Sequence, residues 1–309
     1  MKKLSIILGT ILLLSFFQAC KKAEVEYVEY YDETSIHSDD QARFASEMDA
    51  VCNDVNVALE MTPAFSGMPA VSIGTICDAT ITTDLVSNPR TITLTYNAAA
   101  CLTNRKRAGK VIISMNAGSQ WKNASAEVTI NFVNFKIQRL KDKKDIVFNG
   151  QMLITNESGG LLSGMNDIST VTHKIFSDDI DVLFDNGKDW SWKTARKRVY
   201  SQDNGIVITT TGTQAGGGIS GIGYWGNNRY GKPFLTPILL PLESRQDCNF
   251  RTVNGKIEII LTDRFYATAK LGLNESGDPI SCPGTSNYWL EVVWRNASGD
   301  RRTIRLPYE

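Results

Sequence analysis

The stretch RTITLTYN, residues 90–97, places Ile92, Leu94 and Tyr96 at every second position, with threonines between them. Successive side chains of a β-strand point to opposite faces, so this alternation predicts a strand with one apolar face. From residue 71 onward the chain repeats segments rich in Val, Ile, Thr, Tyr and Trp that are bounded by Gly, Asn, Asp and Pro. On the order of a dozen such segments can be counted. The sequence therefore predicts an all-β, mainly antiparallel sandwich or strongly curved sheet.

The stretch VTINFVNFKI, residues 128–137, shows a change of parity within one strand. Its apolar side chains occupy every second position up to Phe132 and then continue from Val133 through Phe135 to Ile137. One additional residue in a strand shifts the following side chains to the opposite face. A β-bulge or a sheet corner is therefore expected in the middle of this strand.

One helix is predicted before the strands, from Asp39 to about Leu59, and we expect it to pack on the sheet. Ser38 precedes it, and Gln41 follows three residues later in the arrangement of a capping box. Apolar residues recur at helical spacing and would form one buried face. They are Phe44, Met48, Val51, Val55 and Leu59.

The first 19 residues have the layout of a signal peptide. Lys2 and Lys3 precede a short apolar run, and Ala19 comes directly before Cys20. The run is shorter than the roughly 20 apolar residues that a spanning helix needs. The layout indicates an exported lipoprotein that is cleaved before Cys20 and attached to the membrane by lipid on that cysteine. Residues 20–38 are polar and mostly acidic without a clear period, and they are predicted to be a tether at the outer membrane, on its periplasmic or its surface side.

Five cysteines remain after Cys20 for an oxidising compartment. A turn at residues 87–89 separates two strand-like runs and would bring Cys77 close to Cys101. A similar arrangement of strands surrounds Cys248 and Cys282. The expected disulfides are therefore Cys77–Cys101 and Cys248–Cys282, and Cys52 is expected to be a free, buried thiol.

The composition is that of a globular protein, with 42% hydrophobic and 21% charged residues. Residues 39–309 are expected to form the helix and the β domain, with a possible sub-boundary near 243–247. There are 33 basic and 33 acidic side chains, which leaves no net charge. Nucleic acids attract a basic surface, so a nucleic-acid partner is not expected.

The stretch from Cys77 to Met115 contains TITLTYNAAAC, Arg105, Arg107 and the strand GKVIIS. It resembles uncharacterised Bacteroidota lipoproteins, which have a helix after the tether, two cysteines around a Thr-rich strand, and an Arg-x-Gly-Lys strand entry. Further matches are EVTINFVNF, FNGQMLITN, WSWKTARKRVY, the segment Gly212–Gly231, DCNF, VNGKIEI and Cys282. The resemblance covers most of residues 39–309. It implies a cell-envelope location and a β fold, and it implies no activity.

The strand 190–200 carries the first candidate for a ligand-binding surface. Alternation places Trp190, Trp192, Arg196 and Arg198 on one face. Such a face is either a structural ladder of cation–π contacts or a strip that binds a glycan or a polyanion.

The glycine-rich segment Gly216–Gly231 is the second candidate. It is expected to be either a hairpin with bulges or a flexible loop that covers a neighbouring strand. As a loop it would present aromatic and polar side chains, which suit sugar rings or exposed peptide. Its candidate ligand-binding residues are Tyr224, Trp225, Arg229 and Tyr230.

No catalytic or metal-binding motif is recognised. Only two histidines are present, His37 and His173, and His173 is expected to be structural. The acidic residues between 178 and 189 lack the spacing of an EF-hand and are expected to form a solvated turn. No cofactor is expected. The sequence favours a non-enzymatic binding or scaffolding domain anchored in the outer membrane, whose partners are the membrane and either a glycan or an envelope protein. The alternative is a glycan-directed hydrolase or an accessory glycan-binding protein.

Overall fold

The computed structural model describes residues 21–71, 73–99, 102, 104–262, 265–280, 288–295 and 301–308. The chain divides into two compact units, residues 1–45 and 46–309. The described part of the first unit is helical throughout. The second unit contains the rest of the same helix and all of the strands, and the description that follows concerns this unit.

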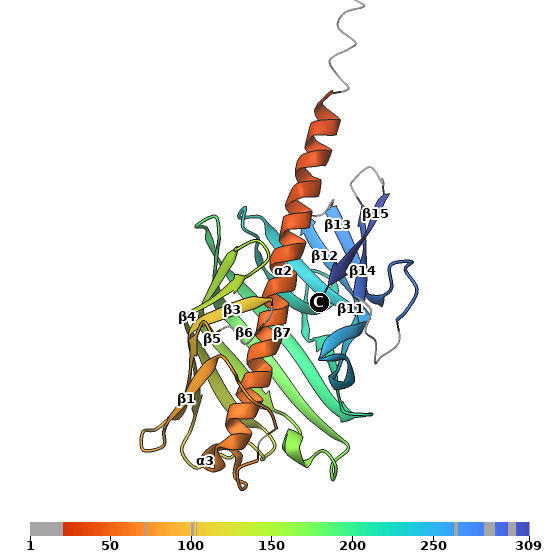
Figure 1. Ribbon diagram of the computed structural model, residues 1–309. Coiled ribbons are helices and arrows are strands. Elements are labelled where there is room, and N and C mark those ends of the chain that lie inside the picture. The colour runs from red at the N-terminus through yellow and green to blue at the C-terminus, as the bar shows by residue number, and fades with distance from the viewer. Residues whose placement is uncertain are drawn as a thin grey trace, which may run out of the picture. The chain divides into compact units, whose positions relative to one another are not determined.

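Figure 1 shows the elements in chain order. They are α2 (Lys21–Met61), α3 (Pro63–Ser66), β1 (Ala79–Asp84), β2 (Arg90–Asn97), β3 (Arg105–Met115), β4 (Ala126–Arg139), β5 (Asp145–Asn156), the 3-10 turn η2 (Leu162–Gly164), β6 (Thr170–Phe184), β7 (Asp189–Gln202), β8 (Ile206–Gly212), β9 (Gln214–Gly216), β10 (Ile219–Asn227), β11 (Pro233–Arg245), the 3-10 turn η3 (Gln246–Cys248), β12 (Arg251–Thr262), β13 (Phe265–Leu273), β14 (Tyr288–Arg295) and β15 (Arg301–Tyr308).

Within the described residues the strands form one 15-stranded antiparallel sheet, which confirms the all-β prediction. Strands β1 to β7 follow one another in space as in sequence, and so do β10 to β15. Strands β3 and β7 lie four places apart in this order, and yet both contact helix residues 46–61. The sheet therefore curves around this part of the helix. Of the two arrangements expected, the curved sheet is the one found.

Strand β4 contains the predicted bulge. Its pairing with β5 shifts between Phe132 and Phe135, and Asn134 between them has a positive φ of 47°. Phe132 and Phe135 both point into the core because of this shift. The sequence pattern therefore located a real irregularity of the sheet.

Strands β8 and β10 share one place in the sheet, end to end between β7 and β11. Strand β8 pairs with the second half of β7, and β10 pairs with residues 192–194 of β7. Where the two strands meet, a Cβ atom on Gly212 would lie 2.0 Å from the carbonyl oxygen of Gly221, so this position requires glycine. Most of the glycine-rich segment is thus strand β10 and its hairpin with β9, and the interpretation as a flexible loop was wrong.

The helix is longer than predicted because α2 begins at Lys21. Residues 21–38 are therefore helical, and the absence of a clear period there did not indicate an irregular chain. The predicted apolar face is confirmed in the second unit, where four of its residues are fully buried: Met48, Val51, Val55 and Leu59. No helix in the described residues is long and apolar enough to cross a membrane.

Strand β11 enters the proposed sub-boundary near 243–247 and ends within it at Arg245, where η3 follows. Residues Leu242 to Arg245 pair with β8, and Glu243 to Arg245 also pair with β12. The sheet is therefore continuous across this region. Residues 1–19, Cys20, Cys101 and Cys282 lie outside the described residues, so cleavage, lipidation and both disulfide pairings stay predictions.

Candidate functional site

The inner face of the sheet, which we define as the face that contacts helix residues 46–61, carries arginines opposite acidic helix residues. Arg105 pairs with Glu47 at 2.7 Å, and Arg107 pairs with Asp54 at 2.8 Å. Further along the sheet, Arg196 of β7 makes a third such contact, with Asp49 at 2.7 Å. The helix is therefore fixed in the curved sheet by charge as well as by apolar packing.

A polar row on the helix makes the contacts with β7. Asp49, Asn53, Asn56 and Glu60 are spaced by four, three and four residues, so they lie along one side of the helix. The first three contact Arg196, Arg198 and Tyr200 of β7. Glu60 accepts hydrogen bonds from the backbone N–H groups of residues 162 and 163, at 2.7 and 2.9 Å. Sequence reasoning missed this polar row, although its helical spacing is visible in the sequence.

Arg107 is the centre of a buried cluster on β3. Its guanidinium group donates two hydrogen bonds to Asp78, at 2.8 and 2.7 Å, and one to Asp54. The ring of Tyr96 lies 4.6 Å from this group, and its hydroxyl donates to Asp54. Burial raises the pKa of Asp54, and the charge of Arg107 opposes that shift. Two inward carboxylates therefore converge here, but both are bound to one arginine rather than facing a cleft.

The predicted ligand-binding face of β7 is the inner face, and it is buried. Trp192 and Arg196 are 0% exposed and Arg198 is 2% exposed, whereas Trp190 is half-buried. The rings of Phe234 and Phe184 lie 4.7 and 5.8 Å from that of Trp192. An accessible binding strip on these residues was therefore the wrong interpretation, because the helix and neighbouring aromatic rings cover the face.

The alternative interpretation, a ladder of cation–π contacts, fits β7 with different aromatic partners. Arg196 lies 4.9 Å from the ring of Tyr224, and Arg198 lies 5.3 Å from that of Tyr200. The expected stacking on Trp190 and Trp192 is replaced by contacts with tyrosines. Tyr224 reaches this strand because β10 pairs with β7, and not as part of a loop that folds over it.

The other candidates of the glycine-rich segment are separated from one another. Arg229 is buried, pairs with Asp185 at 2.7 Å and lies 5.1 Å from the ring of Phe184. Trp225 is half-buried, on the face opposite to Tyr224, and Tyr230 is 44% exposed. These side chains do not form one surface.

His173 is buried, which fits the expected structural role, although its Nε2 atom has no hydrogen-bond partner among the described residues. Its ring lies between those of Trp121 and Tyr200, with centroid distances of 5.0 and 4.9 Å. Burial, with a smaller contribution from the charge of Arg198, lowers the pKa of His173 to about 3. The histidine is therefore neutral at physiological pH. Among the described residues, no group of three or more His, Cys, Asp or Glu side chains is arranged to hold a metal ion.

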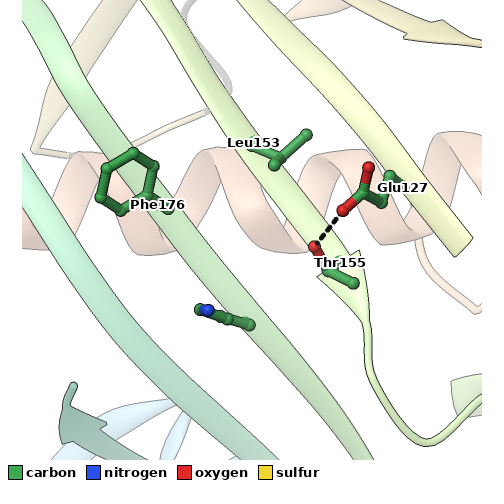
Figure 2. A pocket seen from close by; sticks show the side chains of 5 residues that line it. Glu127, Leu153, Thr155 and Phe176 are labelled. Atoms are coloured by element: carbon green, nitrogen blue, oxygen red, sulfur yellow. Dashed lines mark hydrogen bonds between the residues drawn. The ribbon is translucent and has the colours of Figure 1, made fainter. Parts of the chain in front are cut away.

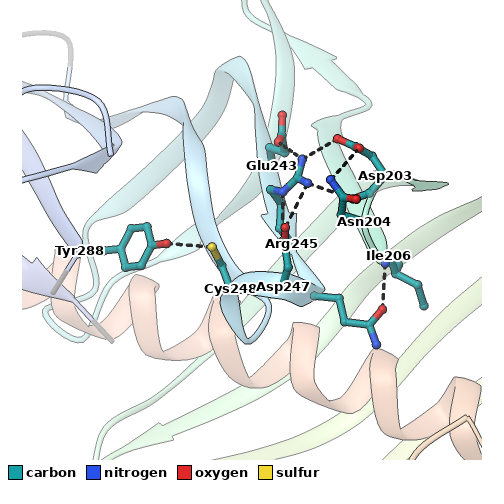
Figure 3. Close-up of polar contacts among 9 residues, drawn as sticks. Asp203, Asn204, Ile206, Glu243, Arg245, Asp247, Cys248 and Tyr288 are labelled. Carbon is teal, nitrogen blue, oxygen red and sulfur yellow. Dashed lines mark hydrogen bonds and ion pairs between the residues drawn. The ribbon is translucent and has the colours of Figure 1, made fainter. Parts of the chain in front are cut away.

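Two of the predicted cysteine environments can be compared with the structure, those of Cys52 and Cys248. Cys52 is a free and buried thiol, as expected, and burial raises its pKa, which keeps the thiol protonated. The sulfur of Cys248 accepts a hydrogen bond from the hydroxyl of Tyr288, at 2.9 Å (Figure 3).

A second arginine cluster lies next to η3, where β8 and β11 meet. Arg245 contacts Asp203, Glu243 and Asp247 at 3.1 to 3.6 Å (Figure 3). Hydrogen bonds to Asp247 and Asp203 raise the pKa of Arg245. Gln246 also accepts a hydrogen bond from the backbone N–H of Ile206. These contacts hold the end of β11 against β8, which is a structural role.

The outer face of the sheet carries a shallow groove across β4, β5 and β6. It has a volume of about 280 Å³ and is lined by Glu127, Leu153, Thr155, Lys174 and Phe176 (Figure 2). The strand register explains why these five side chains lie together. Glu127, Thr155 and Lys174 form one row across the three strands, and Leu153 and Phe176 form a second row.

The groove combines an apolar floor with polar groups at its side. Phe176 is 37% exposed, so part of its ring is open to solvent at the groove. The hydroxyl of Thr155 donates to Glu127 at 3.2 Å. Neighbouring strands are about 4.8 Å apart, so the carboxylate and the ammonium group start from backbones separated by roughly 10 Å. The sequence analysis did not find this site, because its residues come from three strands and have no common motif.

No family model, curated protein or solved structure matches the chain.

Proposed function

We propose that the protein is a lipoprotein anchored in the outer membrane through Cys20, and that its β domain is a non-enzymatic binding or scaffolding module of the cell envelope. The single observation that supports the binding role is the groove on the outer face. The inner face is filled by the helix and its ion pairs, so the outer face is the accessible surface of the sheet.

The anchor is supported by the sequence of residues 1–20, in which a positive start and a short apolar run precede Ala19 and Cys20. A single acyl chain binds a membrane only marginally, so stable attachment requires several. Membrane fractionation of cells that produce the wild type and Cys20→Ala tests this part. We expect the variant to leave the membrane fraction with its β domain still folded, and retention in the membrane would refute the anchor.

The groove favours one class of ligand, a glycan. The apolar C–H faces of a sugar ring pack well against an exposed aromatic ring such as that of Phe176. Glu127, Thr155 and Lys174 are placed beside it to exchange hydrogen bonds with hydroxyl groups. Small-ligand sites commonly combine an apolar surface with a few polar groups in this way.

Of the two glycan-directed alternatives, accessory binding is favoured over hydrolysis. Glycoside hydrolysis generally uses two carboxylates about 5–10 Å apart on either side of the substrate. Of the five side chains that line the groove, Glu127 alone is a carboxylate. We therefore propose binding without cleavage at this groove.

A glycan array probed with the soluble domain, residues 21–309, tests the ligand class. We expect binding that Phe176→Ala abolishes and that Tyr230→Ala, a change of another exposed aromatic residue, leaves intact. Equal binding by wild type and Phe176→Ala, or no binding to any glycan, would refute the assignment of the groove.

A further inference from the structure

The buried arginines of β7 have less negative charge around them than the buried arginine of β3. Arg107 contacts two carboxylates, Asp54 and Asp78. Arg196 and Arg198 together contact one carboxylate among the described residues, that of Asp49, which pairs with Arg196. Arg198 donates to the amide oxygen of Asn53 at 3.3 Å, and an amide carries no charge. The pair on β7 therefore has an excess of one positive charge.

Several hydrogen-bond donors of this pair have no nitrogen or oxygen acceptor among the described residues. The atoms without a partner are Nε and Nη2 of Arg196 and Nε and Nη1 of Arg198. Both side chains are almost completely removed from solvent, at 0% and 2% exposure. Leaving a charged donor buried and unmatched is costly, and buried charges are normally paired or bound to an ion.

The groups around the two arginines are suited to hold an anion, because they add no further positive charge. The hydroxyl of Tyr224 accepts a 2.6 Å hydrogen bond from Arg196, and its ring lies 4.9 Å from the same guanidinium group. Cys52 and His173 are close enough to feel the charge of Arg198, and both are neutral in the folded protein. Asp49 is the part of this cluster that solvent reaches, since 36% of its side chain is exposed.

We propose that Arg196 and Arg198 bind a small monovalent anion of the size of chloride between β7 and helix residues 46–61. The anion accepts the unmatched guanidinium N–H groups and balances the excess charge. The close enclosure of both arginines favours a small ion, and the exposed side of Asp49 gives the route by which it exchanges with solvent. This site lies on the opposite face of the sheet from the groove, so the inference does not depend on the proposed function.

Thermal unfolding in sodium chloride and in sodium gluconate at equal ionic strength tests the site. A ligand that binds only the folded state stabilises it in proportion to the logarithm of its concentration. At a chloride concentration of about ten times Kd, we expect a Tm roughly 3–6 °C higher than in gluconate. Arg198→Met, which removes the charged guanidinium group and keeps an unbranched apolar stem, should lose this difference. Arg229→Met should keep it, because Arg229 already has its own carboxylate in Asp185.

Crystals of the wild type grown in bromide give a second measurement that does not depend on the folding of any variant. We expect an anomalous peak within about 3.5 Å of nitrogen atoms of both Arg196 and Arg198, which is the range of hydrogen-bonding contact. An equal Tm in chloride and gluconate, an equal chloride effect in Arg198→Met, or water alone at this position would each overturn the proposal.

Discussion

The ion pairs that hold the helix predict a large and specific cost for Arg107→Met. The substitution leaves the carboxylates of Asp54 and Asp78 without the guanidinium group that binds both of them. Removing one partner of a buried ion pair costs about 3–5 kcal/mol of unfolding free energy, because a charge stays buried without compensation. Burial already raises the pKa of Asp54, and loss of Arg107 removes the charge that opposes this shift.

The expected cost depends on pH in a defined direction. Without Arg107, Asp54 can avoid its uncompensated charge by binding a proton, which becomes easier as the pH falls. The difference in stability between wild type and Arg107→Met should therefore be largest near pH 7 and should shrink toward pH 5. Urea unfolding of both proteins at several pH values measures this difference.

A matched control separates the effect of burial on stability from the effect of losing any ion pair. Arg305→Met removes an arginine whose side chain is 39% exposed and which pairs with Glu291 at 3.0 Å. Exposed pairs contribute about 0–1 kcal/mol, so this variant should lie within that range. A cost below about 1 kcal/mol for Arg107→Met would refute the reasoning, since it would mean that the cluster is not buried as described.

Three further predictions follow from the positions of individual side chains. Trp192→Ala should cost roughly 3–5 kcal/mol in chemical unfolding because the ring is fully buried, whereas Trp225→Ala, on the other face, should cost about 1 kcal/mol or less. Equal costs would contradict the assignment of faces. His173 has a lowered folded-state pKa, so only the unfolded chain binds its proton between pH 6.5 and about 3, and stability falls as the pH falls. The slope is about 1.4 kcal/mol per pH unit, and His173→Gln should reduce the measured slope by that amount. Cys77→Ser and Cys101→Ser should destabilise alike and without additivity if the two form one bridge, and mass spectrometry that finds Cys52 bridged to Cys77 would contradict the pairing.

The strand pattern could be predicted from sequence because it depends on neighbouring residues. The alternation in residues 90–97 and the parity change in 128–137 both correspond to features of the sheet. Each depends on which face a side chain points to, and successive residues of a strand determine that. The apolar face of the helix could also be predicted, because the spacing of nearby residues determines which of them share a face of a helix.

The role of the arginines on β7 could not be predicted, because it depends on a distant segment. Alternation places Arg196 and Arg198 on one face, but it does not say whether that face is covered. Asp49 and Asn53, which contact them, come about 145 residues earlier in the chain. The outer groove could not be predicted either, because the register of three strands brings its residues together.

The start of the helix was missed for a different reason. The polar composition of residues 21–38 was interpreted as a tether because no apolar period was visible. Backbone hydrogen bonding can continue a helix through such a segment without an apolar face, and α2 does begin at Lys21.

The measurement that tests the central proposal most directly is mass spectrometry of the N-terminal peptide of the protein purified from membranes. A bacterial lipoprotein anchored at Cys20 must begin at that residue and must carry acyl chains on it. We predict a peptide that starts at Cys20, with a mass increased by several acyl groups. A mature chain that starts at any other residue, or one that starts at an unmodified Cys20, would contradict the proposed anchor.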